Sequence, residues 1–405
     1  MITYLPFSAV KPNVYDAVVV GSGFAGSVVA RELAERGGKK VLVIEKRAHI
    51  GGNAYDEYDA HGILVHRYGP HIFHTNSARA FSYIRRFTEW RNYEHTVLSN
   101  WHGTFIPVPF NKNSMELVYG TDEARPLIEK LVDTFGDERK VTINELRAAK
   151  DADLAEVAEF VYRNVFLYYT QKQWGLTPDE VDPSVTARVP VFISRDNRYF
   201  QDTYQGMPAK GYTALFERML DHQNIHICLN TEAESVFELV FADGSEDAPV
   251  TAMKLKNRTV KVPIIYTGPI DELFLARFGR LPYRTLNFVE EYHDVEEYQP
   301  CGTVNYTVSE EFTRITEFKH LTGQVAEGTT IMKEYSLPYT DKATQIPYYA
   351  IINAENNAHY ERYLRLTEGL PNFYPLGRLA EYRYYNMDVI IDRALELADR
   401  LLASD

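Results

Sequence analysis

The feature that most constrains the fold of this chain is a glycine pattern that directly follows a short apolar run. Residues 14–20 read Val-Tyr-Asp-Ala-Val-Val-Val, as expected of a strand buried on both faces of a parallel sheet. The next six residues are Gly21, Ser22, Gly23, Phe24, Ala25 and Gly26. In such a unit the first glycine permits a tight turn, the second lets backbone approach a pyrophosphate, and the third lets the helix pack closely. The pattern therefore predicts a dinucleotide-binding βα unit.

The residues after the glycines continue in the order that this unit needs. A helix is expected over residues 27–36, with Gly37 and Gly38 at its end, and the apolar residues 41–44 are expected to form the second strand. Glu45 stands at the carboxyl end of that strand, where a carboxylate can accept hydrogen bonds from an adenosine ribose. An ordinary glycine turn is the alternative, but the whole succession favours the nucleotide site.

A second glycine pair favours a flavin over a nicotinamide cofactor. Gly51 and Gly52 follow soon after Glu45 and Lys46, and they precede Asn53. This continuation resembles the extended fingerprint of FAD enzymes of the glutathione-reductase and amine-oxidase type, with an ordinary loop as the alternative. The rest of the chain has no second fingerprint of this kind for a nicotinamide nucleotide. We therefore expect one dinucleotide site, occupied by FAD.

The C-terminal segment offers a second contact for the same cofactor. A strand is expected before Gly377 and Arg378, and a last helix over about residues 386–402. This arrangement could place Arg378 on the pyrophosphate and aim the start of the helix, near Met387, at the flavin ring. Helix N-termini favour negative charge, so this end could stabilise a reduced, anionic flavin. A plain strand-helix hairpin is the alternative.

The net charge and the cysteine content limit the kinds of ligand and partner that this chain can bind. The chain has 405 residues and a formal net charge of −13, which argues against nonspecific nucleic-acid binding, because such binding needs a broad basic surface. An anionic small substrate would need a few well-placed arginines instead. Cys228 and Cys301 lack a CxxC spacing and are expected to be packing residues in a reduced compartment. No Cys or His cluster has metal-ligand spacing, so no metal is expected.

The sequence predicts a cytoplasmic location. No stretch approaches the ~20 apolar residues that span a bilayer. Residues 1–12 lack the basic start and apolar core of a signal peptide, and no role is assigned to them.

The predicted fold class is α/β, with a Rossmann-like FAD-binding domain, an inserted helical domain and an antiparallel β-sheet domain. Helical spacing of apolar residues begins near residue 113, strands are expected again over 185–204 and 280–350, and strands at 225–229 and 262–268 are expected to return to the nucleotide domain. A peripheral hairpin is expected over 241–258, with its turn at 242–245. The predicted boundaries are 13–90 with about 208–275 and 355–405 for the FAD-binding domain, 113–182 for the helical domain, and 91–112 with 183–207 and 276–354 for the sheet domain.

Several longer motifs occur in a fixed order along the chain. They are Gly51 to Tyr55, Tyr68 to Thr75, Tyr169 to Gly175, Ala187 to Pro190, Asp196 to Phe200, Thr313 to Ile315, Pro347 to Tyr349, and Gly377 to Asp388. In this order they closely resemble the bacterial UDP-galactopyranose mutases, from about Val14 to the final helix.

The resemblance implies an isomerase that interconverts UDP-galactopyranose and UDP-galactofuranose without net oxidation, in galactofuranose and surface-polysaccharide biosynthesis. It implies that reduced flavin N5 attacks the anomeric carbon of the sugar and displaces UDP, so that the cofactor supplies the nucleophile. The expected partners are the two sugar nucleotides and an external reductant, with NAD(P)H as one candidate and a homo-oligomer as an open alternative.

The resemblance also implies roles for individual residues. Arg188 and Arg314 match the two diphosphate-binding arginines of the family, and Arg198 in the adjacent motif is a further candidate. His74 matches the histidine packed near the flavin ring and could handle a proton. Trp174 matches the tryptophan of the loop that closes over the nucleotide. The expected substrate-cleft residues are Tyr169, Tyr199, Tyr349, Tyr384 and Asn386. Taken singly, each of these residues has an ordinary structural explanation, such as a surface salt bridge or a core position.

Some features depart from the family pattern and keep alternatives open. Asn386 stands where many members have Asp, so its sugar contact could differ. A mutase for UDP-N-acetylgalactosamine or dTDP-fucose is a close variant, because one acetamido group or one missing hydroxyl alters few contacts. A flavin amine oxidase or desaturase, and a noncatalytic flavoprotein, are the more distant alternatives.

Overall fold

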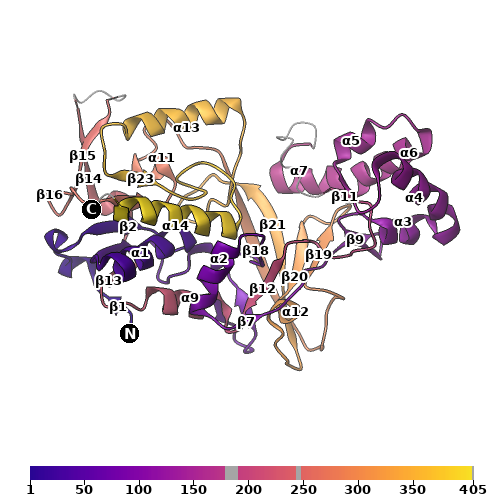
Figure 1. Cartoon of the computed structure of the whole chain (residues 1–405), viewed down its shortest axis with the longest axis horizontal. Coiled ribbons are helices and arrows are strands. Elements are labelled where there is room, and N and C mark those ends of the chain that lie inside the picture. The colour runs from indigo at the N-terminus through magenta and orange to yellow at the C-terminus, as the bar shows by residue number, and fades with distance from the viewer. Residues whose placement is uncertain (178–189, 243–247, 404–405) are drawn as a thin grey trace.

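The computed structural model describes residues 1–177, 190–242 and 248–403. Figure 1 shows a parallel sheet with its helices at one end of the molecule, a helical segment at the other end, and a large antiparallel sheet between them. The predicted fold class is confirmed, while the exact domain boundaries stay a prediction. None of the helices in the described part of the chain has both the length and the apolar character needed to cross a membrane.

The nucleotide-type domain is built on a six-stranded sheet in the order β1-β13-β3-β2-β17-β23. Its strands are β1 (Thr3–Tyr4), β2 (Ala17–Val20), β3 (Val41–Ile44), β13 (Ile225–Cys228), β17 (Ile264–Tyr266) and β23 (Phe373–Pro375), and every neighbouring pair is parallel. All residues of β2 and β3 are buried, as their unbroken apolar sequences require. The short N-terminal segment therefore has a structural role, because β1 extends the sheet at its edge.

Helices cover one face of this sheet and a hairpin with a helix covers the other. Helices α1 (Phe24–Gly37), α9 (Gly211–Leu220) and α14 (Met387–Ala403) contribute to one apolar core with the strands. The second core contains residues of α13 (Ala354–Leu366) and of the hairpin β14 (Phe237–Phe241) and β15 (Val250–Leu255). The predicted hairpin is thus confirmed, while residues 243–245 of its predicted turn lie outside the described residues.

The large sheet has seven strands in the order β22-β18-β21-β20-β19-β8-β9. They are β8 (Val97–Trp101), β9 (Thr104–Val108), β18 (Tyr283–His293), β19 (Thr303–Tyr306), β20 (Arg314–Glu317), β21 (Thr329–Pro338) and β22 (Tyr349–Ala350). The predicted antiparallel strands over 280–350 are confirmed, and β19 pairs in parallel with β8. Strands from residues 97–108 and 283–350 thus share one sheet.

The helical segment packs around its own apolar core. It contains α3 (Lys112–Tyr119), α4 (Thr121–Phe135), α5 (Ile143–Arg147), α6 (Ala152–Val161), a π-helical stretch (Tyr162–Leu167) and α7 (Tyr168–Trp174). Side chains cap the starts of three of these helices: Asn111 for α3, Thr142 for α5 and Asp151 for α6. The predicted cluster of helices is confirmed.

The strands predicted over residues 185–204 are mostly wrong. The described part of that range holds β11 (Val191–Phe192) and the first residue of β12 (Tyr204–Pro208), with bends and one isolated bridge at Arg198 between them. Local side chains compete with sheet pairing there, since Asp196 N donates to Ser194 Oγ at 3.0 Å and Arg198 N donates to Asp196 Oδ1 at 3.0 Å. The first strand also starts late, at Ala17, because Pro12–Val14 forms a 3-10 turn.

The remaining elements connect these layers. They are β4 (Asp56–Tyr58), β5 (Leu64–His66), β6 (Phe73–Thr75), α2 (Ala78–Ile84), β7 (Trp90–Arg91), β10 (Lys140–Val141), α10 (Ala233–Val236), β16 (Arg258–Thr259), α11 (Ile270–Leu273) and α12 (Phe318–Thr322).

Candidate functional site

The predicted nucleotide cradle lies where β2 turns into α1, and Gly21 and Gly26 leave no room for side chains. Gly21 has φ of +97°, and a Cβ there would lie 2.0 Å from Thr267 Oγ1. A Cβ on Gly26 would lie 2.0 Å from the carbonyl oxygen of Gly21, so the helix packs directly on the turn. Gly23 is the N-cap of α1 and makes no side-chain cap hydrogen bond. Phe24 and Ala25, the first residues of α1, line the cavity described below.

The second glycine pair packs against the first glycine turn. Gly52 has φ of +57°, and a Cβ there would lie 2.9 Å from Gly23 Cα. Asn53 follows, and its Oδ1 accepts a hydrogen bond from Arg47 Nη2 at 2.7 Å. The backbones of two turns that are 29 residues apart in sequence (23 to 52) thus form one continuous wall.

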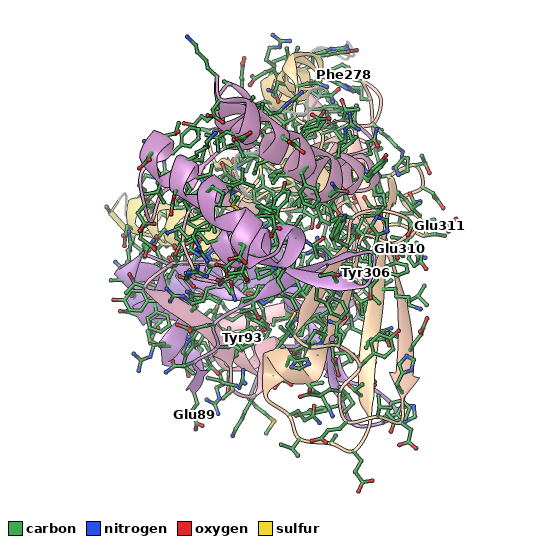
Figure 2. The ribbon with its side chains drawn as sticks, turned by 90° about the vertical axis from the view of Figure 1, so that its right-hand side faces the viewer. Glu89, Tyr93, Phe278, Tyr306, Glu310 and Glu311 are labelled. Atoms are coloured by element: carbon green, nitrogen blue, oxygen red, sulfur yellow. The ribbon has the colours of Figure 1, made fainter. Side chains whose placement is uncertain are left out.

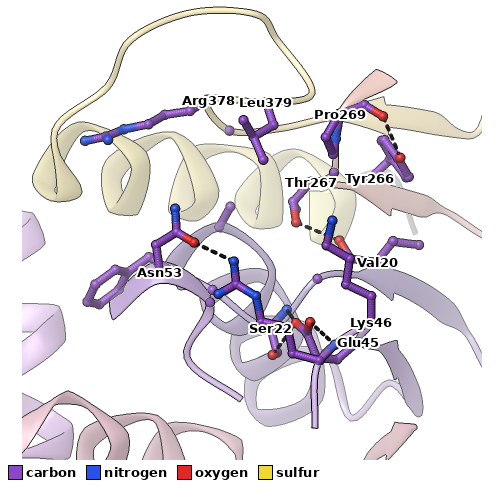
Figure 3. Close-up of a pocket in the computed structure, with 18 of the residues that line it drawn as sticks. Val20, Ser22, Glu45, Lys46, Asn53, Tyr266, Thr267, Pro269, Arg378 and Leu379 are labelled. Atoms are coloured by element: carbon purple, nitrogen blue, oxygen red, sulfur yellow. Dashed lines mark hydrogen bonds between the residues drawn. The ribbon is translucent and has the colours of Figure 1, made fainter. Parts of the chain in front are cut away.

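Glu45 ties the end of β3 to the glycine turn. Its Oε2 accepts hydrogen bonds from Ser22 N at 2.9 Å and Ser22 Oγ at 2.6 Å, and its Oε1 accepts one from Arg47 N at 2.9 Å. Lys46 beside it lies 3.5 Å from Glu272 Oε2. Figure 3 shows Ser22, Glu45 and Lys46 on one side of this cavity and Arg378 on the other. In this structure the Glu45 carboxylate organises the turn, and its contact with a ribose stays a prediction.

The C-terminal segment closes the cavity from the opposite side. Arg378 Nε donates to the carbonyl oxygen of Tyr385, and its guanidinium lies 4.4 Å from the ring centroid of Tyr384. The structure brings together all of the predicted cofactor residues except Gly26, which packs beneath the turn. The lining residues among them are Gly21, Gly23, Phe24, Ala25, Glu45, Lys46, Gly52, Asn53, Arg378 and Met387.

A second, more polar cavity adjoins the first and contains most of the predicted substrate residues. It is lined by His74, Tyr169, Trp174, Tyr199, Arg314, Tyr349, Tyr384 and Asn386, among others. The two cavities share lining residues, namely Asn53, His71, Arg378, Asn386 and Met387. A ligand held in the first cavity could therefore reach a ligand held in the second.

One predicted arginine, Arg198, is not among the described residues that line this cavity. The guanidinium of Arg198 binds Asp196 through Nε at 3.0 Å and Nη2 at 2.8 Å, and its Nη1 binds Glu94 at 3.1 Å. Its side chain is 37% exposed, so it forms a surface ion-pair group. Arg188 lies outside the described residues.

The floor of the second cavity is a row of side chains on neighbouring strands. Strand register pairs Asn305 with Arg314 and Arg314 with Glu334. Arg314 Nη2 lies 3.3 Å from Glu334 Oε1, and both side chains are largely buried. Asn305 Oδ1, Thr303 Oγ1 and Arg314 Nε are buried without a hydrogen-bond partner among the described residues. These groups can bind polar atoms of a ligand, because buried polar atoms otherwise remain unsatisfied.

Glu334 keeps the Arg314 guanidinium protonated in the cavity. Burial acts to lower the pKa of Arg314, but the nearby charge of Glu334 raises that pKa above its usual value. Burial raises the pKa of Glu334, and the charge of Arg314 opposes that rise. An anionic ligand placed here would meet a guanidinium whose Nε has no hydrogen-bond partner among the described residues, next to a buried carboxylate.

Three histidines line the cavity with different hydrogen-bond roles. His74 Nδ1 lies 2.7 Å from Asp202 Oδ2, and its ring stacks on Phe200 at a centroid distance of 3.5 Å. His71 Nδ1 lies 2.9 Å from the carbonyl oxygen of Gly69, which can only accept, so His71 Nδ1 carries the proton. Burial lowers the pKa of His71 to about 3, which leaves the ring neutral.

His95 is a lining residue that sequence reasoning did not find. It is buried, its Nδ1 lies 3.2 Å from the Tyr93 hydroxyl, and burial lowers its pKa to about 3. Three other lining residues were also not identified from the sequence, namely Thr303, Asn305 and Glu334. Side chains alternate along an extended segment, so His95 and Val97 lie on the same side. This alternation could have identified His95 only if that side were already known to line the cavity.

Comparison with known proteins identifies the family to which this chain is similar. A family model described as UDP-galactopyranose mutase matches residues 164–384, and one described as an NAD(P)-binding Rossmann-like domain matches residues 19–87. The chain is 35% identical to a UDP-galactopyranose mutase of Mycoplasma pneumoniae, over 96% of this chain and 97% of that protein. It is also 35% identical to a dTDP-fucopyranose mutase of Escherichia coli, over 94% and 97% of the two chains. A crystal structure of reduced UDP-galactopyranose mutase shares the fold, with a TM-score of 0.64, 16% identity, and coverage of 96% and 94%.

Proposed function

Because this chain belongs to the UDP-galactopyranose mutase family, we propose that it interconverts UDP-galactopyranose and UDP-galactofuranose with a bound, reduced FAD. The observation that carries the proposal is the wall shared by the two cavities. Asn53, His71, Arg378, Asn386 and Met387 line both, so a cofactor in the glycine cradle can present its reactive end to a substrate above Arg314. Members of this family are isomerases, and a site of this form needs no second nucleotide for each turnover.

The residues of the cradle fit FAD. The contact between Gly52 and Gly23 keeps side chains out of the wall, and the uncapped start of α1 offers N–H donors to a diphosphate. Lys46 and Arg378 add positive charge along the same cavity. When bound and reduced, FAD supplies N5 as the nucleophile for the anomeric carbon, and the reaction returns it without net loss of a hydride.

Arg314 is proposed to hold the diphosphate of the substrate. Its partly paired guanidinium can bind two phosphate oxygens at once and stabilise the charge of UDP as it leaves. Arg188 is proposed as its partner from the family motif. The tyrosine hydroxyls at Tyr169, Tyr199, Tyr349 and Tyr384 are proposed to orient the same group, since all four side chains line the cavity.

His74 is proposed to hold or move a proton next to the sugar. With Nδ1 donating to Asp202, its Nε2 is the ring nitrogen that can accept a proton from a sugar hydroxyl. The stack on Phe200 fixes the plane of the imidazole ring. Asn386 lies on the shared wall and is proposed to contact the sugar as a neutral amide.

The test is to incubate dithionite-reduced holoprotein with UDP-galactofuranose and to separate pyranose from furanose by chromatography. We expect conversion to UDP-galactopyranose without stoichiometric consumption of reductant or oxygen. Net oxidation of an added amine, with oxygen consumed, would support the amine-oxidase alternative. If no sugar nucleotide is converted in either direction, the proposed function is wrong.

The dTDP-fucopyranose mutase of Escherichia coli supports a second candidate substrate, because it matches this chain as well as the M. pneumoniae mutase does. The same assay with dTDP-fucopyranose and UDP-N-acetylgalactosamine compares the three sugars. The substrate with the highest kcat/KM is the one for which the site is built.

A further inference from the structure

Helix α7 carries side chains that line the second cavity and not the cradle. Tyr169, Gln173 and Trp174 all line that cavity and none of them lines the cradle. Trp174 packs on Tyr349 at a centroid distance of 5.6 Å. On the proposed function the sugar must lie near the wall shared with the cradle, so α7 lies beside the nucleotide half of the substrate.

A lysine on α7 reaches into the backbone of the large sheet. Lys172 Nζ donates to the carbonyl oxygens of Glu310 at 2.8 Å and Phe312 at 3.2 Å, and also to that of Tyr306. These three carbonyls belong to the end of β19 and the loop that leads to β20. Figure 2 shows Tyr306 and Glu310 close together on the side of the molecule that carries the helical segment. One ammonium group therefore has three acceptors on a different layer of the protein.

An arginine on the sheet makes the reverse contact. Arg284, on β18, donates from Nε to the carbonyl oxygen of Gln173 at 3.0 Å and from Nη2 to that of Lys172 at 3.1 Å. Ser336 Oγ, on β21, also donates to the Gln173 carbonyl, at 2.6 Å. The last carbonyls of a helix have no partner within the helix, so these donors cap the end of α7.

The two cations hold α7 through backbone rather than through surface ion pairs. Among the described residues, no carboxylate oxygen lies within 4.0 Å of Lys172 Nζ or of the Arg284 guanidinium. Arg284 is buried and Lys172 is partly buried. Hydrogen bonds from charged donors to buried carbonyls are strong and directional, so they can fix the position of the helix.

We propose that Lys172 and Arg284 form a reciprocal clamp, each donating to backbone carbonyls of the opposite layer, and that this clamp positions Tyr169 and Trp174 for the uridine diphosphate half of the substrate. Both are positioning residues that act through α7. This inference rests on the proposed function only for the identity of the nucleotide.

The test compares Lys172→Met with Lys130→Met in the FAD-loaded enzyme. Lys130, on α4 in the same helical segment, makes exposed ion pairs with Asp151 and Asp153 and is the matched control. We expect Lys172→Met to bind UDP about 10-fold or more weakly in calorimetry, and to raise amide hydrogen exchange across residues 168–174. The control should change neither quantity, and the flavin absorbance spectrum should be the same in all three proteins.

The result that overturns the proposal is unchanged UDP affinity in a folded Lys172→Met holoenzyme, whether or not hydrogen exchange rises. If that variant does not fold, Arg284→Lys replaces it, because a lysine keeps the charge but cannot hold two carbonyls in the same geometry. Unchanged UDP affinity in Arg284→Lys would then overturn the proposal. A wild-type enzyme that binds UDP but makes no furanose would instead refute the proposed function and leave the clamp standing.

Discussion

At the scale of single residues, Arg314 is the side chain that we propose to hold the diphosphate of the substrate. It lies on the floor of the second cavity beside Glu334, and its Nε has no hydrogen-bond partner among the described residues. The sequence suggested Arg314 through its motif, but it could not show that Glu334 balances the charge. It also favoured Arg198, whose guanidinium is held by Asp196 and Glu94 instead.

We expect Arg314→Lys to lower kcat/KM by about 10²- to 10³-fold while FAD stays bound. Lysine keeps a positive charge next to Glu334 but loses the planar fork that binds two phosphate oxygens. Steady-state kinetics and the flavin absorbance of the purified variant provide the measurement. Arg198→Lys is the matched control and should remain within about threefold of wild type, because Arg198 lies outside the cavity lining. Loss of FAD from Arg314→Lys would place Arg314 at the cofactor and contradict this prediction.

Gly52 offers a test of the cradle at the same scale. An added methyl would lie 2.9 Å from Gly23 Cα, and neither backbone can move away without opening the wall. We expect Gly52→Ala to lower FAD affinity by about 10-fold or more, measured by fluorescence titration of the apoprotein. Gly62→Ala is the control, since Gly62 also has positive φ, +76°, but a Cβ there meets nothing within 4 Å. Equal loss in both variants would mean that backbone strain, rather than the contact, causes the effect.

At the scale of elements, local sequence patterns were a good guide to strands and helices that obey one period. The apolar runs of β2, β3 and β13 and the helical spacing of α3 to α7 were predicted because each pattern reflects burial on fixed faces. Residues 194–202 were mispredicted because Ser194, Asp196 and Arg198 bond locally to one another. The start of α1 at Phe24, three residues before the predicted Ser27, follows from the glycine turn acting as the first turn of the helix.

The short helix α11 carries an element-scale prediction about pH. Burial raises the pKa of Asp271 from 3.8 to about 6, and its Oδ2 accepts a hydrogen bond from Leu281 N at 3.1 Å. Because the folded state binds this proton more tightly than the unfolded chain, its contribution to stability is greatest below pH 4 and is lost as the pH rises through 6. We expect Asp271→Asn to raise the free energy of unfolding at pH 7.5, by up to about 3 kcal/mol.

The measurement is thermal or urea unfolding of both proteins at pH 7.5 and at pH 4. The gain should become small at pH 4, where Asp271 is protonated in the folded state and partly protonated in the unfolded chain. A gain that is the same at both pH values would show that the substitution acts through something other than the carboxyl charge.

At the scale of the whole molecule, the arrangement of charge matters more than its total. The chain carries a formal charge of −13, yet Arg47 and Arg378 line the cradle and Arg314 lines the adjoining cavity. These guanidinium groups would attract an anionic cofactor and substrate, while the carboxylates of Glu45, Glu234 and Glu272 also line the cradle and that of Glu334 lines the adjoining cavity.

The redox state of the holoenzyme provides the prediction at this scale. We expect the oxidised enzyme to be at least about 100-fold slower than the reduced enzyme, equivalent to about 2.7 kcal/mol in the barrier. The physical reason is that N5 of oxidised flavin is an electron-poor imine nitrogen, whereas N5 of reduced flavin is an electron-rich amine that can attack a carbon. Anaerobic assays of the same sample before and after dithionite, with the flavin spectrum recorded, give the comparison. Equal rates in both states would exclude N5 as the nucleophile.

The cradle, its second glycine pair and the start of the C-terminal helix were predictable from the sequence alone, because each depends on residues close together in the chain. Steric needs of tight turns and the period of buried strands act over a few residues, so they can be read directly. The structure was needed to show that one cavity is lined by His95, Thr303, Asn305, Arg314 and Glu334, and that Arg198 does not line it. It also showed that Lys172 donates hydrogen bonds to the β19–β20 loop. The physical reason is strand register, which joins segments more than 200 residues apart (97 to 303). The backbone hydrogen bonds that set this register are the same for nearly every residue type, so the sequence does not reveal which segments pair.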